Sequence, residues 1–185
     1  MALSILFSQA LRPYTGVELR PHFLLTELGL KGSGVVGFAG PCRVQTEHLV
    51  DWEDRLAQDR IEAREMLHFI GEFFGRSLSE GVLLQRLFMA IMGELLRPAV
   101  PSLYRDGDDL FVGERKLSVS IVTASPVSIL LHTGINIDPT GAPVPAIGLR
   151  ELGVDPIDWA GKVLNRFSQE WEGMEWACTK VRPVV

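Results

Sequence analysis

Two long strand-forming runs in the second half of the chain constrain its fold more than any other feature. The run from Lys116 to Ala124 (KLSVSIVTA) and the run from Ser128 to Ile137 (SILLHTGINI) are rich in β-branched and other apolar residues, as is typical of strands. Ser125 and Pro126 mark a tight turn between them. A connection this short joins strands that run antiparallel. The sequence therefore predicts an antiparallel strand pair inside a sheet.

The other predicted elements mix strands and helices without a strict β-α-β alternation. Further strands are predicted over residues 3–7, 35–38, 65–74, 103–105 and 110–112, with an Asp-Gly hairpin turn at residues 106–107. Helices are predicted over residues 22–28, 79–96 and 156–171, and a last strand after them. The charged segment 55–64 is expected at the surface, as a helix or a loop. The fold class is therefore α+β, a central and mostly antiparallel sheet flanked by helices, in one domain over residues 1–185.

The segment from Ser79 to Leu96 is the clearest helix of the sequence. Its apolar residues recur at spacings of three and four, which predicts one face packed against the sheet. The expected buried stripe consists of Val82, Leu83, Leu87, Ala90, Ile91 and Leu95, with Glu94 among them.

Composition excludes several classes of protein. The net charge of -5 and the isoelectric point near 5.4 argue against non-specific nucleic-acid binding, which needs clustered Lys and Arg. No apolar run is long enough to span a membrane. The two cysteines, Cys42 and Cys178, are far apart in sequence, which favours reduced thiols and a cytoplasmic location.

Three pieces of the C-terminal half resemble the biotin and lipoate protein ligases, in the order in which that family has them. DDLFVGERKLSVSI, from Asp108 to Ile121, is similar to the family's strand–turn–strand with its lysine, which maps on to Lys116. HTGINID, from His132 to Asp138, is similar to the family's G-x-N strand. IGLRELGVDPIDW, from Ile147 to Trp159, is similar to the turn and helix start of lipoyl-type transferases.

The N-terminal half also resembles an uncharacterised prokaryotic family known as domain of unknown function 366. The residues that carry this likeness are YTGVELRPHF and GPCRVQTEHLVDWED. The likeness extends over nearly the whole chain and implies the ligase-like fold, but it implies no activity.

The ligase resemblance implies a reaction in which a small carboxylic acid is activated and then passed to a carrier protein. ATP is the implied cofactor if the activation is an adenylation. A fixed ammonium stabilises the negative charge that develops on the carboxylate and phosphate oxygens, and Lys116 is the expected catalytic residue. The Gly/Arg-rich loop and the P-C-G cysteine of family members have no counterpart here. Cys42, between Pro41 and Arg43, is either a nucleophile activated by positive charge or a small packing residue.

The expected substrate-binding residues come from two segments. Arg43, His48 and Asp51 lie in the polar run before Asp54, which is expected to shape the substrate end of the pocket. His132, Gly134 and Asn136 lie on the G-x-N strand. Gly134 permits a close backbone approach, and Asn136 can bond to a backbone carbonyl and so support the pocket without touching a ligand. His68 has apolar neighbours and is expected to be a packing residue.

Two alternatives to an acyl-transfer enzyme stay open at this point. The first is a non-catalytic protein that keeps the fold and binds a small molecule, because the Gly/Arg loop is missing. The second is a metal-dependent hydrolase built on Glu47, His48 and Asp51, because a helix would bring Glu47 and Asp51 on to one face beside His48. An oligomer is compatible with all three functions.

Overall fold

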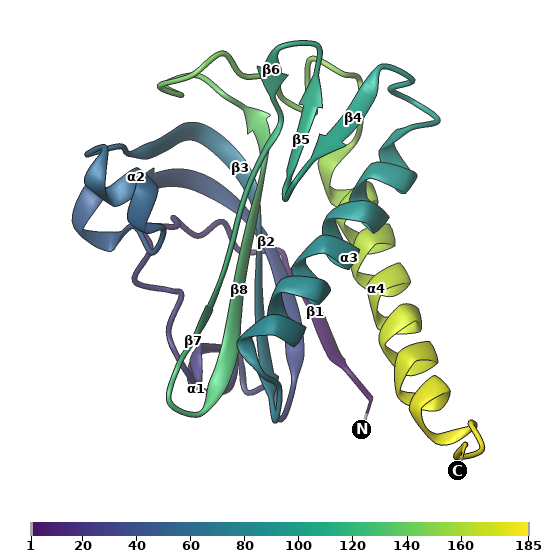
Figure 1. Cartoon of the computed structure of the whole chain (residues 1–185). Coiled ribbons are helices and arrows are strands. Elements are labelled where there is room, and N and C mark those ends of the chain that lie inside the picture. Colours follow the sequence, from purple (N-terminus) through teal and green to yellow (C-terminus); the bar gives the residue numbers. More distant parts are fainter. Residues whose placement is uncertain (1, 185) are drawn as a thin grey trace.

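A five-stranded mixed sheet forms the centre of the computed structural model, which describes residues 2–184. In spatial order its strands are β1 (Ser4–Ser8), β2 (Gly34–Val44), β3 (Ile61–Phe74), β8 (Ser128–Asp138) and β7 (Ser118–Ala124). β1 runs parallel to β2, and every other neighbouring pair is antiparallel (Figure 1). The predicted α+β fold with a mostly antiparallel sheet is confirmed, and so is the predicted pairing of β7 with β8.

A smaller three-stranded sheet lies at one end of the large one (Figure 1). It consists of β4 (Leu103–Asp106), β5 (Asp109–Val112) and β6 (Arg115–Lys116). The β4–β5 turn follows the prediction, since Gly107 has a φ of 59°, which glycine adopts readily. Lys116 ends β6, and Ser118 begins β7 two residues later, so this turn carries the chain from the small sheet into the large one.

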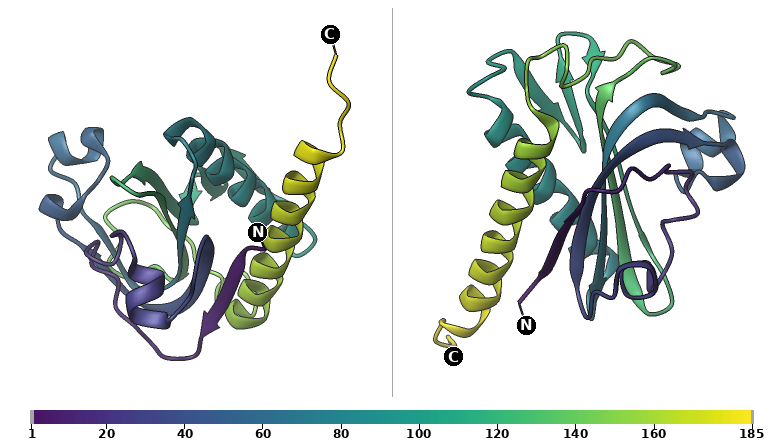
Figure 2. Two further views of the ribbon diagram at one scale, coloured as in Figure 1. Left: turned by 90° about the horizontal axis from the view of Figure 1, so that it is seen from below. Right: turned by 180° about the vertical axis from the view of Figure 1, so that it is seen from behind.

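Two long helices, α3 (Leu78–Leu96) and α4 (Pro156–Thr179), pack on one face of the large sheet (Figures 1 and 2). Phe69 and Phe73 of β3 point to this face, where they meet Phe88 of α3 and Phe167 of α4 edge to face. Because successive strand residues point to opposite faces, their neighbours Met66, His68 and Ile70 point away from the helices. No helix within residues 2–184 is long and apolar enough to cross a lipid bilayer.

The second face of the sheet is covered only in part. It carries the N-terminal segment, the short helix α1 (Phe23–Leu28), a single turn of 3₁₀ helix (Thr46–His48) and α2 (Trp52–Leu56). Figure 2 shows these short elements on the side of the sheet away from α4. Because they leave β7 and β8 uncovered toward one end, a cavity opens on this face.

Three sequence predictions were wrong in detail. The buried face of α3 contains Leu84, Phe88 and Met92, whereas Leu83, which was expected to be buried, is 69% exposed. Most of this helix is apolar, so the spacing alone did not select the side that packs on the sheet. The segment after Trp171 continues α4 to Thr179 instead of forming a strand. The charged segment 55–64 ends in the first residues of β3, which begins at Ile61.

Candidate functional site

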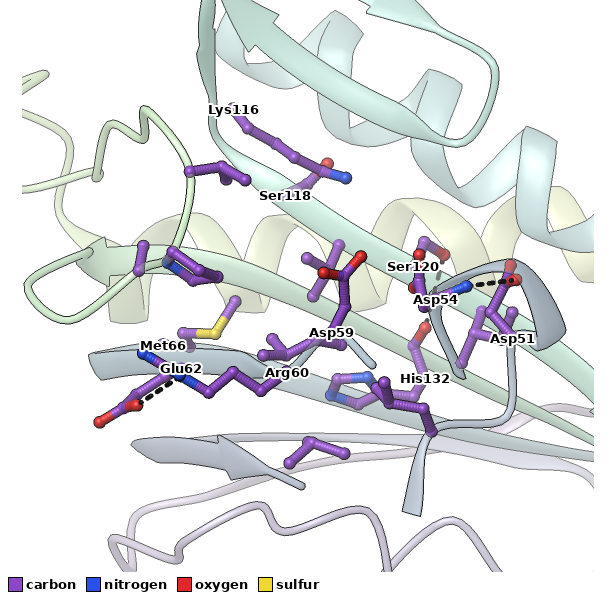
Figure 3. A pocket seen from close by; sticks show the side chains of 18 of the residues that line it. Asp51, Asp54, Asp59, Arg60, Glu62, Met66, Lys116, Ser118, Ser120 and His132 are labelled. Atoms are coloured by element: carbon purple, nitrogen blue, oxygen red, sulfur yellow. Dashed lines mark hydrogen bonds and ion pairs between the residues drawn. The ribbon is translucent and has the colours of Figure 1, made fainter. Parts of the chain in front are cut away.

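The candidate site is a cavity of about 360 Å³ on the sheet face opposite α3 and α4. β3, β7 and β8 form its floor, and the segments 48–62 and 142–146 form its rim (Figure 3). Polar side chains of the N-terminal and C-terminal halves therefore meet in one place. The residues that matter for its chemistry lie around Lys116, around His132 and in the rim before β3.

Lys116 lines the cavity at the end where β6 leads into β7. Its ammonium lies 2.7 Å from a carboxylate oxygen of Asp109, and its side chain is 31% exposed. The backbone of Lys116 is held on both sides, since its N–H donates to the carbonyl of Pro145 at 2.9 Å and its carbonyl accepts from the N–H of Ile147 at 3.1 Å. A fixed backbone limits where the ammonium can reach, as a charge-stabilising group requires.

Asp109 is the charge partner of Lys116 and is mostly buried. Burial raises the pKa of its carboxyl group, and the hydrogen bond from Lys116 lowers that pKa without reversing the shift. The effect of burial on the pKa of this carboxyl group is therefore larger than the opposite effect of the ion pair with Lys116.

Asn136 has the supporting position that the sequence indicated. Its side-chain amide donates to the carbonyl of Lys116 at 3.2 Å, and its own N–H donates to the carbonyl of Leu117 at 2.9 Å. Asn136 also lines the cavity. It ties β8 to the turn that carries Lys116, so a change at Asn136 reaches the ammonium through the backbone.

His132 lies on β8 and forms part of a buried stack of aromatic rings. The ring of Tyr14 stacks on it in parallel, with 3.7 Å between the ring centres and 5° between the planes. His68 of β3 lies beside both rings, and its Nδ1 is 3.2 Å from Nε2 of His132. Burial lowers the pKa of His68 to about 4, and burial together with the proximity of His68 lowers the pKa of His132 well below its usual value. Both imidazoles are therefore neutral at neutral pH.

The rim before β3 holds two of the three predicted residues of the polar run. His48 and Asp51 line the cavity, whereas Arg43 does not; its guanidinium is exposed and lies 3.5 Å from Glu62. The run does not form one helix, because Glu47 and His48 belong to the 3₁₀ turn and Asp51 caps the separate helix α2. The expected common face of Glu47 and Asp51 is therefore wrong.

Within residues 2–184, no group of three His, Cys, Asp or Glu side chains is arranged to hold a metal ion. Asp51 also uses its carboxylate on the backbone N–H groups of Glu53 and Asp54. The hydrolase alternative loses the arrangement on which it depended.

Negative charge dominates the polar lining of the cavity. Its carboxylates are Asp51, Asp54, Asp59, Glu62, Asp108 and Asp109. Its cationic side chains are Lys116 and Arg60, and Arg60 is 3.4 Å from Glu62. Burial and the neighbouring Asp51 raise the pKa of Asp54. Phosphate oxygens would face strong repulsion here, so this lining does not fit a bare triphosphate.

The surroundings of Gly134 and Cys42 indicate packing roles for both residues. A Cβ at Gly134 on β8 would lie 2.6 Å from the side chain of Met66 on β3 and 3.0 Å from that of Val119 on β7. The glycine therefore lets both side chains pack directly against β8. Cys42 is buried on β2, and burial, with Glu18 and Glu62 nearby, raises its pKa to about 12. Of the two alternatives for Cys42, the small packing residue agrees with these surroundings, because the side chain is buried and the charged groups that affect its pKa are carboxylates.

Sequence reasoning missed Tyr14, Asp109 and the role of His68 in the site. Asp109 carried a signal, since it lies in the same strand–turn–strand motif as Lys116. The position of His68 two residues from Met66 shows that it shares the cavity face, but its partner His132 is 64 residues away and nothing local connects them. Tyr14 had no signal at all.

Solved structures of ligases share this fold. A variant of the biotin protein ligase from Aquifex aeolicus in complex with biotin superimposes with a TM-score of 0.58 at 19% identity, over 93% of this chain and 71% of that one. A lipoate-protein ligase A bound with ATP superimposes with a TM-score of 0.53 at 13% identity, over 92% and 85%. The fold is therefore that of the biotin and lipoate protein ligases.

Two further relatives are much more similar. A protein of unknown function from Pyrococcus horikoshi matches over the full length of both chains, with a TM-score of 0.95 and 36% identity. An uncharacterized protein of Methanocaldococcus jannaschii is 31% identical over 99% of this chain and 86% of its own length. The model of one family, described as Domain of unknown function (DUF366), matches residues 3–182. The chain therefore belongs to the DUF366 family and has the fold of the biotin and lipoate protein ligases.

Proposed function

We propose that this protein binds a small carboxylic acid in the cavity beside Lys116 and transfers its acyl group to an acceptor. The observation that carries the proposal is the position of Lys116, which lines the cavity while three hydrogen bonds hold its backbone N–H and carbonyl. The acid enters the step as an activated derivative, a thioester or an acyl-adenylate. An amine of the acceptor attacks its acyl carbon, the bond from that carbon to sulfur or to the phosphate oxygen breaks, and the thiolate or AMP leaves while the amine gives up a proton. The ammonium of Lys116 stabilises the negative charge that develops on the acyl oxygen.

Two sources can activate the acid, adenylation by Mg-ATP or a thioester formed beforehand, and the carboxylate-rich lining favours the thioester because it does not fit a bare triphosphate. Two assays therefore test the two sources of activation. One measures acid-dependent exchange of pyrophosphate into ATP in the presence of Mg²⁺. The other supplies short acids as thioesters and measures acyl transfer to a carrier-protein lysine.

Lys116→Ala is the decisive variant, and Lys162→Ala is its matched control. Both lysines form an ion pair of 2.7 Å with an aspartate, but Lys162 is exposed on α4, which packs on the sheet face opposite the cavity. We expect Lys116→Ala to lower the rate by about 100-fold or more, the size that loss of one charge-stabilising group produces. Lys162→Ala should retain the wild-type rate. Equal rates for wild type and Lys116→Ala in both assays would exclude the proposal.

A second function, binding without catalysis, is favoured by one specific observation. The lining contains six carboxylates and two cationic side chains, which leaves little positive charge for a reaction centre. A thermal-shift screen separates the two functions. Stabilisation by a small acid that depends on Lys116, with no turnover in either assay, would establish a binding protein.

A further inference from the structure

One ring nitrogen of His132 has no hydrogen-bond partner within residues 2–184. Nε2 of His132 lies 3.2 Å from Nδ1 of His68, and no described group bonds to its Nδ1. The residue is 2% exposed, and it lines the cavity. Figure 3 shows its imidazole among the side chains of the cavity, on a different side from Lys116. Because His132 lines the cavity, a partner for this nitrogen has to come from a molecule inside the cavity.

The hydrogen bonds of His68 determine which atoms carry protons. Nε2 of His68 lies 3.2 Å from the carbonyl of Gly40, which can only accept, so this nitrogen carries the proton. A neutral imidazole has one N–H, and the pKa of about 4 keeps His68 neutral at neutral pH. Nδ1 of His68 is therefore an acceptor, and Nε2 of His132 must be the donor between the two rings.

The same reasoning applied to His132 leaves its Nδ1 without a proton. Its Nε2 holds the one N–H of the neutral ring, so Nδ1 carries a lone pair. Tyr14 stacks flat on this ring and His68 bonds its far edge, and together they hold the ring in this orientation. A ring flip would break the bond to His68. The cavity therefore presents an acceptor of hydrogen bonds that cannot act as a donor.

We propose that the cavity contains a subsite at His132 for a neutral N–H or O–H donor of the ligand, with His68 as the positioning residue. Asn136, beside Lys116, and His132 are four residues apart on β8, a separation of about 13 Å along a strand. The inference rests on the proposed function for the other end of the ligand. The substrate class is thus a small acid that carries an N–H or O–H group at the end opposite its carboxyl group.

The first measurement uses the ligand-free wild-type chain labelled with nitrogen-15 in histidine. Long-range proton–nitrogen correlation spectra distinguish protonated from unprotonated ring nitrogens. At neutral pH we expect His132 to have a protonated Nε2 and an unprotonated Nδ1. A protonated Nδ1 would overturn the proposal, whatever the enzyme assays show.

The second measurement uses two fragments that differ only in their donors, imidazolidinone and its N,N′-dimethyl derivative. Imidazolidinone should shift the Nδ1 resonance of His132 and bind at least about tenfold more tightly than the dimethyl compound, since the latter leaves the nitrogen without a partner. Equal binding of the two fragments would overturn the proposal. So would the absence of a shift from imidazolidinone up to its solubility limit.

A third measurement tests the positioning role of His68. In His68→Phe the ring still packs against Tyr14 and Phe38, but the acceptor for Nε2 of His132 is gone. We expect a population of His132 with Nδ1 protonated and a loss of the preference between the fragments. An unchanged spectrum and preference would remove His68 from the proposal. None of these readouts involves Lys116, so their failure and the failure of the proposed acyl transfer can be told apart.

Discussion

Gly40→Ala tests how much the close approach of the N-terminal segment to β2 contributes to the stability of the fold. Gly40 lies next to an irregularity in the pairing of β2 with β3. A Cβ at this position would lie 1.8 Å from the carbonyl oxygen of Arg12 and 2.6 Å from its carbon. Both are backbone atoms, so no side-chain rotation relieves the overlap. The segment around Arg12 has to move by more than an ångström.

The hydrogen bonds that such a movement breaks give the expected magnitude. The N–H of Arg12 donates to the carbonyl of Ala39 at 3.0 Å, and the N–H of Tyr14 donates to that of Pro41 at 2.9 Å. A third bond, from the N–H of Arg43 to the carbonyl of Tyr14, is also 2.9 Å long. At about 1 kcal/mol net for each bond, the variant should lose about 3 kcal/mol of the free energy of unfolding.

Equilibrium unfolding in urea measures this loss, with Gly161→Ala as the matched control. Gly161 lies inside α4, and a Cβ there meets nothing within 4 Å. The same substitution should therefore stabilise the protein by about 0.5 to 1 kcal/mol through helix propensity. The reasoning would be refuted if Gly40→Ala stayed within about 0.5 kcal/mol of wild type, the usual range for surface substitutions.

Three further predictions follow from burial. Cys42 should resist alkylation in the native protein at neutral pH, because burial raises its pKa to about 12, whereas the exposed Cys178 should react. If mass spectrometry finds that both cysteines are modified at the same rate, this prediction is wrong. Phe88→Ala should lower the free energy of unfolding in urea by about 3 to 5 kcal/mol, whereas Leu83→Ala on the exposed side of the same helix should change it by no more than about 0.5 kcal/mol. The reverse order would mean that the other side of α3 packs on the sheet. The pKa of His68 is about 4 in the folded protein and 6.5 in the unfolded chain, so between these pH values the unfolded chain binds more protons. The free energy of unfolding should therefore fall as the pH decreases from 6.5 to about 4, by up to about 1.4 kcal/mol per pH unit. His68→Phe should lessen this slope in urea titrations at a series of pH values, and an equal slope in the variant would disprove the assignment.

The sequence by itself determined the elements whose signals are local. The antiparallel pairing of β7 with β8 followed from two strand runs and the short turn at Ser125 and Pro126. Asp155 caps α4 just before Pro156, as its position predicted, because cap and turn chemistry acts within a few residues. The proximity of Lys116 to Asn136 also followed, since Lys116 lies just before β7, the strand that pairs with β8.

Only the tertiary structure decided which faces are buried and which distant residues meet. In α3 nearly every side is apolar, so the packing partners select Phe88 over Leu83 for the core. The acceptor at His132 depends on Gly40, His68 and Tyr14, which come from different segments and share no sequence pattern. The physical reason is the same in both cases. A pattern of apolar residues gives their spacing along one element, whereas the contact between elements depends on strand register and on the fit of side chains that are far apart in the chain.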